Sequence, residues 1–338
     1  MILLAAVIAF ALAAGIARWL AAGRGFVVLD HPNERSLHET PVPRTGGLAI
    51  VAAIITAHAL ALAAGVPAGE AAIVGVGAAA VFMVSLCDDV HGVPIALRML
   101  VHAGAASWLV YCGLGLDALR LPGRELALLP ALAAALSVLS VVWLTNLYNF
   151  MDGMDGFAGG MGAIGFATLA MLAWRAGDPG LALRGGVIAA ACMGFLLLNF
   201  PPARLFMGDA GSSVLGFAAA ATALEADRRG VFALWLSLLV FSPFVVDATV
   251  TLLRRALNAE AVWLAHRSHF YQRLVRLGWS HRRTTLRAYV LMAACAASAL
   301  AVQHAPWPLQ AATLFAWALI YAILMLVVTR LERARGRE

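Results

Sequence analysis

The chain of 338 residues is 62% hydrophobic and only 12% charged, and its formal net charge is +6. Soluble domains carry about 25% charged residues, and a soluble protein of this length could not bury so much apolar surface in one core. The composition therefore excludes a soluble globular protein and predicts an all-α, polytopic integral membrane protein.

All 24 basic residues are arginines. Without lysine, every cation available to bind a phosphate is an arginine guanidinium or a metal ion. The positive charge suits membrane lipids or an anionic substrate, and the lack of a basic stripe interleaved with aromatic residues argues against nucleic acid. The cysteines lie in or beside apolar runs without metal-binding spacing, which indicates packing residues: Cys87, Cys112, Cys192 and Cys295.

About eleven transmembrane helices of ~20 residues would use roughly 220 residues of the chain. The remaining residues, about 120, leave no room for a soluble domain, so we expect a single membrane domain with its chemistry on loops and helix ends. The weakest run, 212–226, is short and rich in alanine. The apolar runs are 2–22, 47–66, 70–87, 95–116, 126–146, 159–175, 181–198, 212–226, 231–253, 287–304 and 309–329.

The arginines predict an orientation for these helices. No basic residue precedes the first run, which favours an uncleaved helix with its N-terminus outside over a signal peptide. With this start, 17 arginines fall on inner segments and 6 on outer loops, so the C-terminus lies inside. Loss of the weak run would invert the last two spans. The inner loops, which hold the polar motifs, cover about 23–46, 88–94, 147–158, 199–211 and 254–286.

The first two inner loops carry the first polar motifs. Segment 30–47 reads DHPNERSLHETPVPRTGG, and its three prolines and Gly-Gly pair predict a structured loop, with a solvated connector as the alternative. The third apolar run ends in Asp88 and Asp89. Adjacent carboxylates at the end of an apolar helix repel each other unless a cation or a donor compensates. A divalent cation is the simplest explanation, and a water-exposed helix end is the alternative.

Four polar side chains recur every three residues in segment 146–160, which reads NLYNFMDGMDGFAGG. On a regular helix this row would drift by about 60° per step, but Gly153 and Gly156 indicate that the backbone leaves the helix here. The pattern predicts that amides and carboxylates converge on one ligand, with a polar capped turn as the alternative. The four residues are Asn146, Asn149, Asp152 and Asp155.

Segment 206–213, FMGDAGSS, precedes another apolar run. Its serines can cap the next helix and its glycines allow a ligand to approach the backbone closely. Asp209 is then left to bind a metal ion beside a helix N-terminus, which favours phosphate.

Segment 254–287 is the longest polar stretch, with eight arginines and with His266, His269 and His281. Two histidines three residues apart do not complete a zinc site, and the carboxylates of the other loops fit a hard cation such as Mg²⁺ better. The histidines and arginines would then hold a nucleotide or diphosphate, or the arginines anchor the loop to the inner membrane surface. Asp247, which follows Pro243 by four residues, is either functional or paired with an arginine at 254 or 255.

These motifs occur in one order, and HRSHFYQRL at 266–274 completes them. The sequence closely resembles the polyprenyl-phosphate N-acetylhexosamine-1-phosphate transferases of glycosyltransferase family 4, over about residues 30–281. The resemblance implies a bacterial inner-membrane enzyme that uses Mg²⁺ (or Mn²⁺) at its cytoplasmic face. It would transfer a sugar-1-phosphate from a UDP-N-acetylhexosamine to undecaprenyl phosphate and release UMP. The family includes phospho-N-acetylmuramoyl-pentapeptide transferase and the initiating enzymes of O-antigen, enterobacterial common antigen and teichoic acid synthesis.

The resemblance also implies roles for individual residues. The metal ligands would be Asp88, Asp89 and Asp209. Catalytic carboxylates would be Asp88, Asp89, Asp152 and Asp155, with Asp88 preferred as a base. The substrate-binding residues would be Arg44, Gly46, Gly47, Asn146, Asn149, Arg204, Arg254, His266, Arg267 and His269.

The HRSHFYQRL form is similar to the O-antigen type of enzyme, and the longer ending resembles enzymes for N-acetylfucosamine- or N-acetylquinovosamine-type sugars. Phe157 stands where leucine is usual, and His102 stands where the family often has glutamine. The exact sugar, a covalent aspartyl intermediate and the oligomeric state, a homodimer included, stay open. A secondary transporter is the alternative function, but transporters place their charges near the bilayer midplane, usually with internal repeats.

Overall fold

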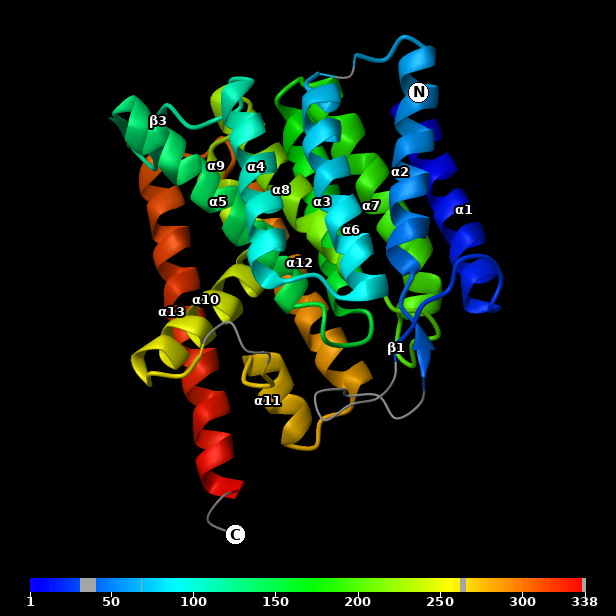
Figure 1. Ribbon diagram of the computed structural model, residues 1–338. Coiled ribbons are helices and arrows are strands. Elements are labelled where there is room, and N and C mark those ends of the chain that lie inside the picture. Colours follow the sequence, from blue (N-terminus) through cyan, green and yellow to red (C-terminus); the bar gives the residue numbers. More distant parts are fainter. Residues whose placement is uncertain (31–40, 68, 262–265, 336–338) are drawn as a thin grey trace.

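The computed structural model describes residues 1–30, 41–67, 69–261 and 266–335, and within them the chain is a bundle of helices with two small β-hairpins (Figure 1). The all-α, polytopic fold class is confirmed. The helices are α1 Ile2–Ala21, α2 Gly46–Ala63, α3 Ala71–His91, α4 Ile95–Tyr111, α5 Pro130–Phe150, α6 Phe157–Arg175, α7 Pro179–Asn199, α8 Asp209–Arg228, α9 Leu234–Val240, α10 Ser242–Leu257, α11 Phe270–Arg276, α12 His281–Val302 and α13 Trp307–Arg335. The antiparallel pairs are β1 Leu29–Asp30 with β2 Val42–Pro43, and β3 Ala118–Leu121 with β4 Arg124–Ala127.

Each of the eleven predicted apolar runs coincides with one helix or with the pair α9–α10. In the described part of the chain, eight helices are long and apolar enough to cross a membrane, and α9–α10 would be a ninth span that bends by 83°. The two remaining runs are α4, which has only 17 residues, and α8, which is too polar to pass the same test. Eleven crossings, and the predicted orientation, stay predictions.

Burial explains why α8 is the weakest run in the sequence. Every residue from Ala210 to Asp227 is buried, because α8 packs against α2, α3, α5 and α9. Its small residues allow this contact: a Cβ on Gly216 would lie 2.6 Å from the carbonyl oxygen of Leu144 on α5. A helix that is enclosed by other helices does not need the apolar surface that lipid demands.

The break between α9 and α10 falls beside a proline, as the sequence suggests. Phe241 separates the two helices, and Pro243 lies in the first turn of α10, where its missing N–H costs no helical hydrogen bond. The bend places the first turns of α10 inside the bundle, so that Asp247 is buried.

The polar loops gather at one end of the bundle, the lower end in Figure 1, where the described C-terminus also lies, while the chain begins at the other end. Backbone hydrogen bonds join these loops: the N–H of Phe206 donates to the carbonyl of Pro43 at 2.7 Å, and that of Gly47 to Met207 at 2.7 Å. Residues 31–40 of the first-loop motif and 262–265 of the last inner loop lie outside the described residues.

Candidate active site

Asp89, in the last turn of α3, caps the N-terminus of α8. Its carboxylate accepts hydrogen bonds from the backbone N–H groups of Asp209 and Ala210, both at 3.0 Å. Such N–H groups lack partners within the helix, so a carboxylate there is stabilised by hydrogen bonds and by the helix dipole. Arg44 donates to the carbonyl oxygen of Asp89, and its Nε lies 3.7 Å from Oδ1. A Cβ on Gly208 would lie 2.2 Å from the Arg44 carbonyl oxygen, so this junction requires glycine.

A single guanidinium joins the two neighbouring carboxylates. Arg98, in the first turn of α4, forms an ion pair with Oδ2 of Asp88, and its Nη1 lies 3.2 Å from Oδ2 of Asp209. The other oxygen of Asp88 accepts the backbone N–H of Val93 at 2.6 Å. The side chain of Asp209 keeps 35% exposure, against 12% for Asp88, so Asp209 presents the more accessible carboxylate.

Asp152, in the turn between α5 and α6, adds a carboxylate to this region. Burial of its carboxyl, followed by the nearby negative charges of Asp209 and Asp89, raises the pKa of Asp152 well above its usual range. Among the described residues, no hydrogen bond or ion pair involves its side chain. Asp152 is therefore the least engaged carboxylate of the cluster, which we call the carboxylate cluster: Asp88, Asp89, Asp152 and Asp209.

The polar residues predicted to converge in segment 146–160 do not share one environment. Asn149 donates to the hydroxyl of Ser212 on α8 at 3.0 Å, so it lies beside the first turn of α8, where the carboxylate cluster is. Asn146 is buried and donates to its own helix at Val142, 2.7 Å away, and lies 3.2 Å from Nδ1 of His102 on α4. Because α5 stays helical to Phe150, two residues three positions apart do not point in the same direction. Asn146 therefore contacts His102, whereas Asn149 contacts Ser212.

Asp155 links the start of α6 to the α7–α8 loop and to α12 by hydrogen bonds. Its carboxylate lies 3.3 Å from Nδ1 of His281 and accepts the backbone N–H of Ala203 at 3.1 Å, while its carbonyl accepts the hydroxyl of Thr285 at 2.8 Å. Burial opposes ionisation of this carboxyl, but the hydrogen bonds outweigh it and hold the pKa of Asp155 below its usual range. These partners of Asp155 are thus different from those of the carboxylate cluster, and its contacts join neighbouring segments.

The Gly46–Gly47 pair, predicted to bind substrate, lies where α2 meets α8. A Cβ on Gly47 would lie 2.4 Å from the backbone nitrogen of Gly211, and one on Gly46 would lie 2.6 Å from the carbonyl oxygen of Phe206. The pair therefore permits the close approach of two backbones, which positions Arg44 and Asp209.

The histidine motif is held by Asp247. Its oxygens accept the backbone N–H of Phe270 at 2.9 Å and of Tyr271 at 3.2 Å, and Nδ1 of His269 lies 3.2 Å from Oδ1. Asp247 thus caps α11 and is not paired with an arginine; Arg255 instead lies 3.3 Å from Glu260. His269 is buried, so it supports α11.

His266 and the arginines around it are more accessible. The ring of His266 lies 4.8 Å from that of His269, and its Nδ1 lies 2.8 Å from the hydroxyl of Ser268. Burial, followed by the positive charges of His269 and the neighbouring arginines, lowers the pKa of His266 to about 4, so it is neutral at pH 7. Arg254 donates to the Ser268 carbonyl at 3.2 Å, and Arg267 lies in the same segment.

The histidine motif touches the carboxylate cluster through Tyr271. A Cβ on Gly153, next to Asp152, would lie 2.4 Å from the Tyr271 hydroxyl. Arg204 is exposed in the loop between α7 and α8. Within the described ranges, no three His, Cys, Asp or Glu side chains form a preformed metal-binding group.

Comparison with known proteins supports the family inferred from the motifs. The glycosyl transferase family 4 model matches residues 71–227, which contain the whole carboxylate cluster. A probable undecaprenyl-phosphate N-acetylglucosaminyl 1-phosphate transferase of Bacillus subtilis is 30% identical, over 82% of this chain and 78% of its own. The chain belongs to the polyprenyl-phosphate hexosamine-1-phosphate transferase family.

Other relatives in this family differ in how much of the chain they match. The decaprenyl-phosphate N-acetylglucosaminephosphotransferase of Mycolicibacterium smegmatis is 33% identical, over 91% of this chain and 83% of its own. A phospho-N-acetylmuramoyl-pentapeptide-transferase of Synechococcus is 34% identical but covers only 34% of this chain and 32% of its own. The resemblance expected from the motifs is thus confirmed at the level of the family.

Sequence reasoning missed Arg98 and Tyr271, which shape the site of this transferase, and did not find the partners of Asp247. Arg98 joins Asp88 to Asp209, and its signal was a lone arginine at the start of an apolar run. Asp247 was singled out, but its partners on α11 lie 23 and 24 residues away and follow no periodic pattern. Tyr271 had no signal beyond its place in the HRSHFYQRL motif.

Proposed function

We propose that this chain transfers an N-acetylhexosamine-1-phosphate from a UDP-sugar to undecaprenyl phosphate, with release of UMP, at the cytoplasmic face of a bacterial inner membrane. The proposed role is the first step of O-antigen or related surface-polysaccharide synthesis. The names of the relatives support a polyprenyl-phosphate acceptor and transfer of an N-acetylglucosamine phosphate group. The UDP donor follows from the resemblance of the motifs, and the HRSHFYQRL motif supports the O-antigen type.

The observation that carries this proposal is the carboxylate cluster beside the N-terminus of α8. Among the described residues, the ion pairs of these four carboxyl groups involve two arginines, Arg44 and Arg98, so full ionisation of the cluster needs a further cation. Two negatively charged substrates could approach it only with further cations. A site of carboxylate oxygens is the donor set that Mg²⁺ prefers.

The hydrogen bonds of the carboxylate cluster indicate different roles for the three predicted metal ligands, Asp88, Asp89 and Asp209. Asp209 and Asp88 are the residues that would hold Mg²⁺, which could take the place of the guanidinium of Arg98 that both now contact. Both oxygens of Asp89 are instead engaged by the first backbone N–H groups of α8, which a cation does not replace. We therefore assign Asp89 to positioning Asp209. A bound Mg²⁺ would supply charge neutralisation for the diphosphate and the leaving UMP.

The protein's own side chains would then orient the two substrates and remove a proton from the acceptor phosphate where one is still bound. The acceptor phosphate has a second pKa of about 6 and is mostly dianionic at neutral pH. The positioning of the two substrates therefore matters more than a strong base. Where a proton must be removed, Asp152 is a further candidate beside Asp88, because Asp88 is bound by Arg98 and by Val93 whereas Asp152 is unengaged in the described structure. The raised pKa of Asp152 means that it would act as a base only when a bound cation offsets the charges of Asp209 and Asp89. Arg204, Arg254 and Arg267 with His266 would hold the nucleotide-sugar phosphates.

The deciding experiment is a donor screen with purified protein, undecaprenyl phosphate, Mg²⁺ and a panel of UDP-N-acetylhexosamines. UMP release is measured for each sugar, and omission of the acceptor lipid is the control. We expect acceptor-dependent release with at least one sugar, and the pattern across the panel identifies the donor. No release with any sugar would contradict the proposed function.

A further inference from the structure

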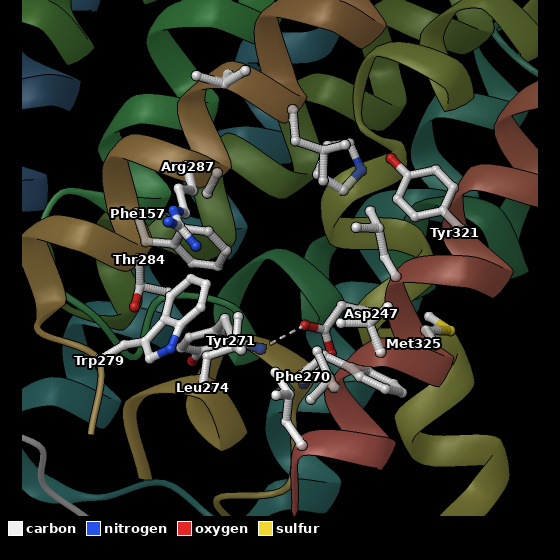
Figure 2. A pocket seen from close by; sticks show the side chains of 18 of the residues that line it. Phe157, Asp247, Phe270, Tyr271, Leu274, Trp279, Thr284, Arg287, Tyr321 and Met325 are labelled. Carbon is white, nitrogen blue, oxygen red and sulfur yellow. Dashed lines mark hydrogen bonds between the residues drawn. The ribbon is translucent and has the colours of Figure 1, made fainter. Parts of the chain in front are cut away.

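A large cavity lies outside the carboxylate cluster, between α10, α11, α12 and α13. Its volume is about 660 Å³, and most of its lining is apolar. Figure 2 shows Trp279, Thr284 and Arg287 on one side, Asp247, Tyr321 and Met325 on the other, and Tyr271 between them. Apart from Phe157, every lining residue lies beyond residues 71–227, the part that the family model matches.

The walls of this cavity continue into the lipid-facing surface. Val290 on α12 is 71% exposed, and Val327 on α13 is 47% exposed. Because both helices are candidate membrane spans, aliphatic side chains exposed on them face the acyl chains of the bilayer. An acyl chain can therefore enter the cavity from the membrane.

One edge of the cavity carries unpaired positive charge. The guanidinium groups of Arg283 and Arg287, one helical turn apart, each lie 4.3 Å from the Trp279 ring. Neither arginine forms an ion pair with any residue that the structure describes. Two like charges held together without an acidic partner favour an anion between or beside them. The one carboxylate in the lining, Asp247, has its oxygens engaged by the N–H groups of α11.

Aromatic rings close the cavity toward the catalytic side. Phe157 and Tyr271 are 3% and 4% exposed, their ring centroids are 4.6 Å apart, and the Tyr271 hydroxyl lies against Gly153. A headgroup held at Arg287 is therefore separated from Asp152 by these rings. The cavity is suited to a bound lipid that does not react.

We propose that this cavity binds an anionic glycerophospholipid of the bilayer, with one acyl chain between α12 and α13 and its phosphate at Arg283, Trp279 and Arg287. Basic pockets between membrane helices at the side of an anionic leaflet recognise such headgroups. The lipid would brace α12 and α13 against α11, which carries Tyr271 to the edge of the carboxylate cluster. The proposal goes beyond the transferase activity and does not depend on it.

The test measures lipid binding to the purified, delipidated full chain by native mass spectrometry. The probes are phosphatidylglycerol, phosphatidylcholine and undecaprenyl phosphate. Arg287→Gln removes the cation in the lining, and Arg282→Gln, an exposed neighbour, is its matched control. Ala294→Trp fills the cavity from α12, and Ala293→Trp, which is exposed and outside the lining, is the second control.

We expect phosphatidylglycerol to bind more tightly than phosphatidylcholine. Loss of one arginine near the headgroup costs about 1 kcal/mol, so R287Q weakens phosphatidylglycerol binding about five-fold. A294W also weakens it, whereas both control variants bind like the wild type. Equal binding of the two phospholipids, equal effects of variants and controls, or displacement of phosphatidylglycerol from this cavity by undecaprenyl phosphate would each overturn the proposal.

Discussion

At the scale of single residues, Asp209 is the residue on which the proposed metal site depends most. It is the more exposed of the two carboxylates that Arg98 joins, and its backbone N–H is held by Asp89. Asp209→Asn keeps the shape of the side chain and removes its charge. We expect turnover to fall about 100-fold or more, because a metal-bound carboxylate supports several kcal/mol of charge stabilisation.

Two measurements separate this effect from misfolding. Thermal unfolding with and without Mg²⁺ should show stabilisation of the wild type by the ion and none of the Asp209→Asn variant. Asp117→Asn, a half-exposed carboxylate near β3, is the control and should behave as the wild type in both assays. Near-normal turnover of Asp209→Asn would remove Asp209 from the metal site.

His266 makes a pH prediction at the same scale. Its pKa of about 4 in the folded protein lies below the ordinary value of 6.5, so the unfolded chain binds a proton that the folded chain does not. The contribution of His266 to stability is complete above pH 6.5 and is lost as the pH falls toward 4. His266→Gln should therefore lose less stability between pH 7 and 5 than the wild type does, as measured by thermal unfolding.

The control for this prediction is His304→Gln, an exposed histidine at the opposite end of the bundle. It should follow the wild type across the same pH range. Identical curves for the wild type and His266→Gln would show that His266 is protonated in the folded protein near its ordinary pKa.

At the scale of elements, two carboxylates on membrane helices serve as caps for helices that follow later in the chain. Asp89 on α3 caps α8, and Asp247 on α10 caps α11. Both groups were expected to need compensation, because a charge at the end of an apolar helix is costly. Backbone N–H groups supply that compensation, which a pattern of residue types along the chain does not reveal.

The cap of α11 predicts a kinetic effect. Asp247→Ala should loosen α11 and raise the KM for the UDP-sugar more than it lowers kcat, because His266 and His269 belong to the same segment. Loss of a cap costs about 1–2 kcal/mol, so the variant still folds. Steady-state kinetics with varied donor concentration give the measurement.

Asp178→Ala is the matched control for the cap. Asp178 caps α7 at the other end of the bundle, where it accepts the N–H of Leu181 at 2.9 Å. It should lower the thermal stability similarly and leave KM unchanged. An unchanged KM in Asp247→Ala, together with a comparable loss of stability, would show that α11 does not contact the donor.

At the scale of the whole molecule, the alternation of the helices predicts the sides of the membrane. The β3–β4 hairpin and the loops that follow α3 and α5 lie at opposite ends of the bundle (Figure 1). The carboxylate cluster lies beside these loops, since Asp88 and Asp89 are in the last turn of α3 and Asp152 follows α5. The arginine distribution predicts that the hairpin is outside and the C-terminus inside. A fluorescent protein fused to the C-terminus should therefore fluoresce, and alkaline phosphatase inserted at Gly123 in the hairpin should be active.

Reversed results for the two fusions would contradict the orientation and place the carboxylate cluster outside. A fusion after Gly177, between α6 and α7 at the hairpin's end of the bundle, is an independent check and should behave like the hairpin.

The amino-acid sequence by itself determined the class of protein and the segments that carry its chemistry. Composition alone required a helical membrane protein, because only helices can satisfy so much backbone within lipid when loops are short. The runs of apolar residues located the helices, and the ordered motifs located the loops that meet at one end. These properties depend on local composition and spacing, which are visible along the chain.

Only the tertiary structure decided which of these polar residues act together. Asp88 and Asp209 are 121 residues apart and share Arg98, while Asn146 and Asn149 are neighbours in sequence and have different partners. The same holds for α8, which is polar enough to fail as a span but is enclosed by other helices. Hydrogen bonds and burial depend on which helices pack together in space, and no periodicity along the chain specifies that arrangement.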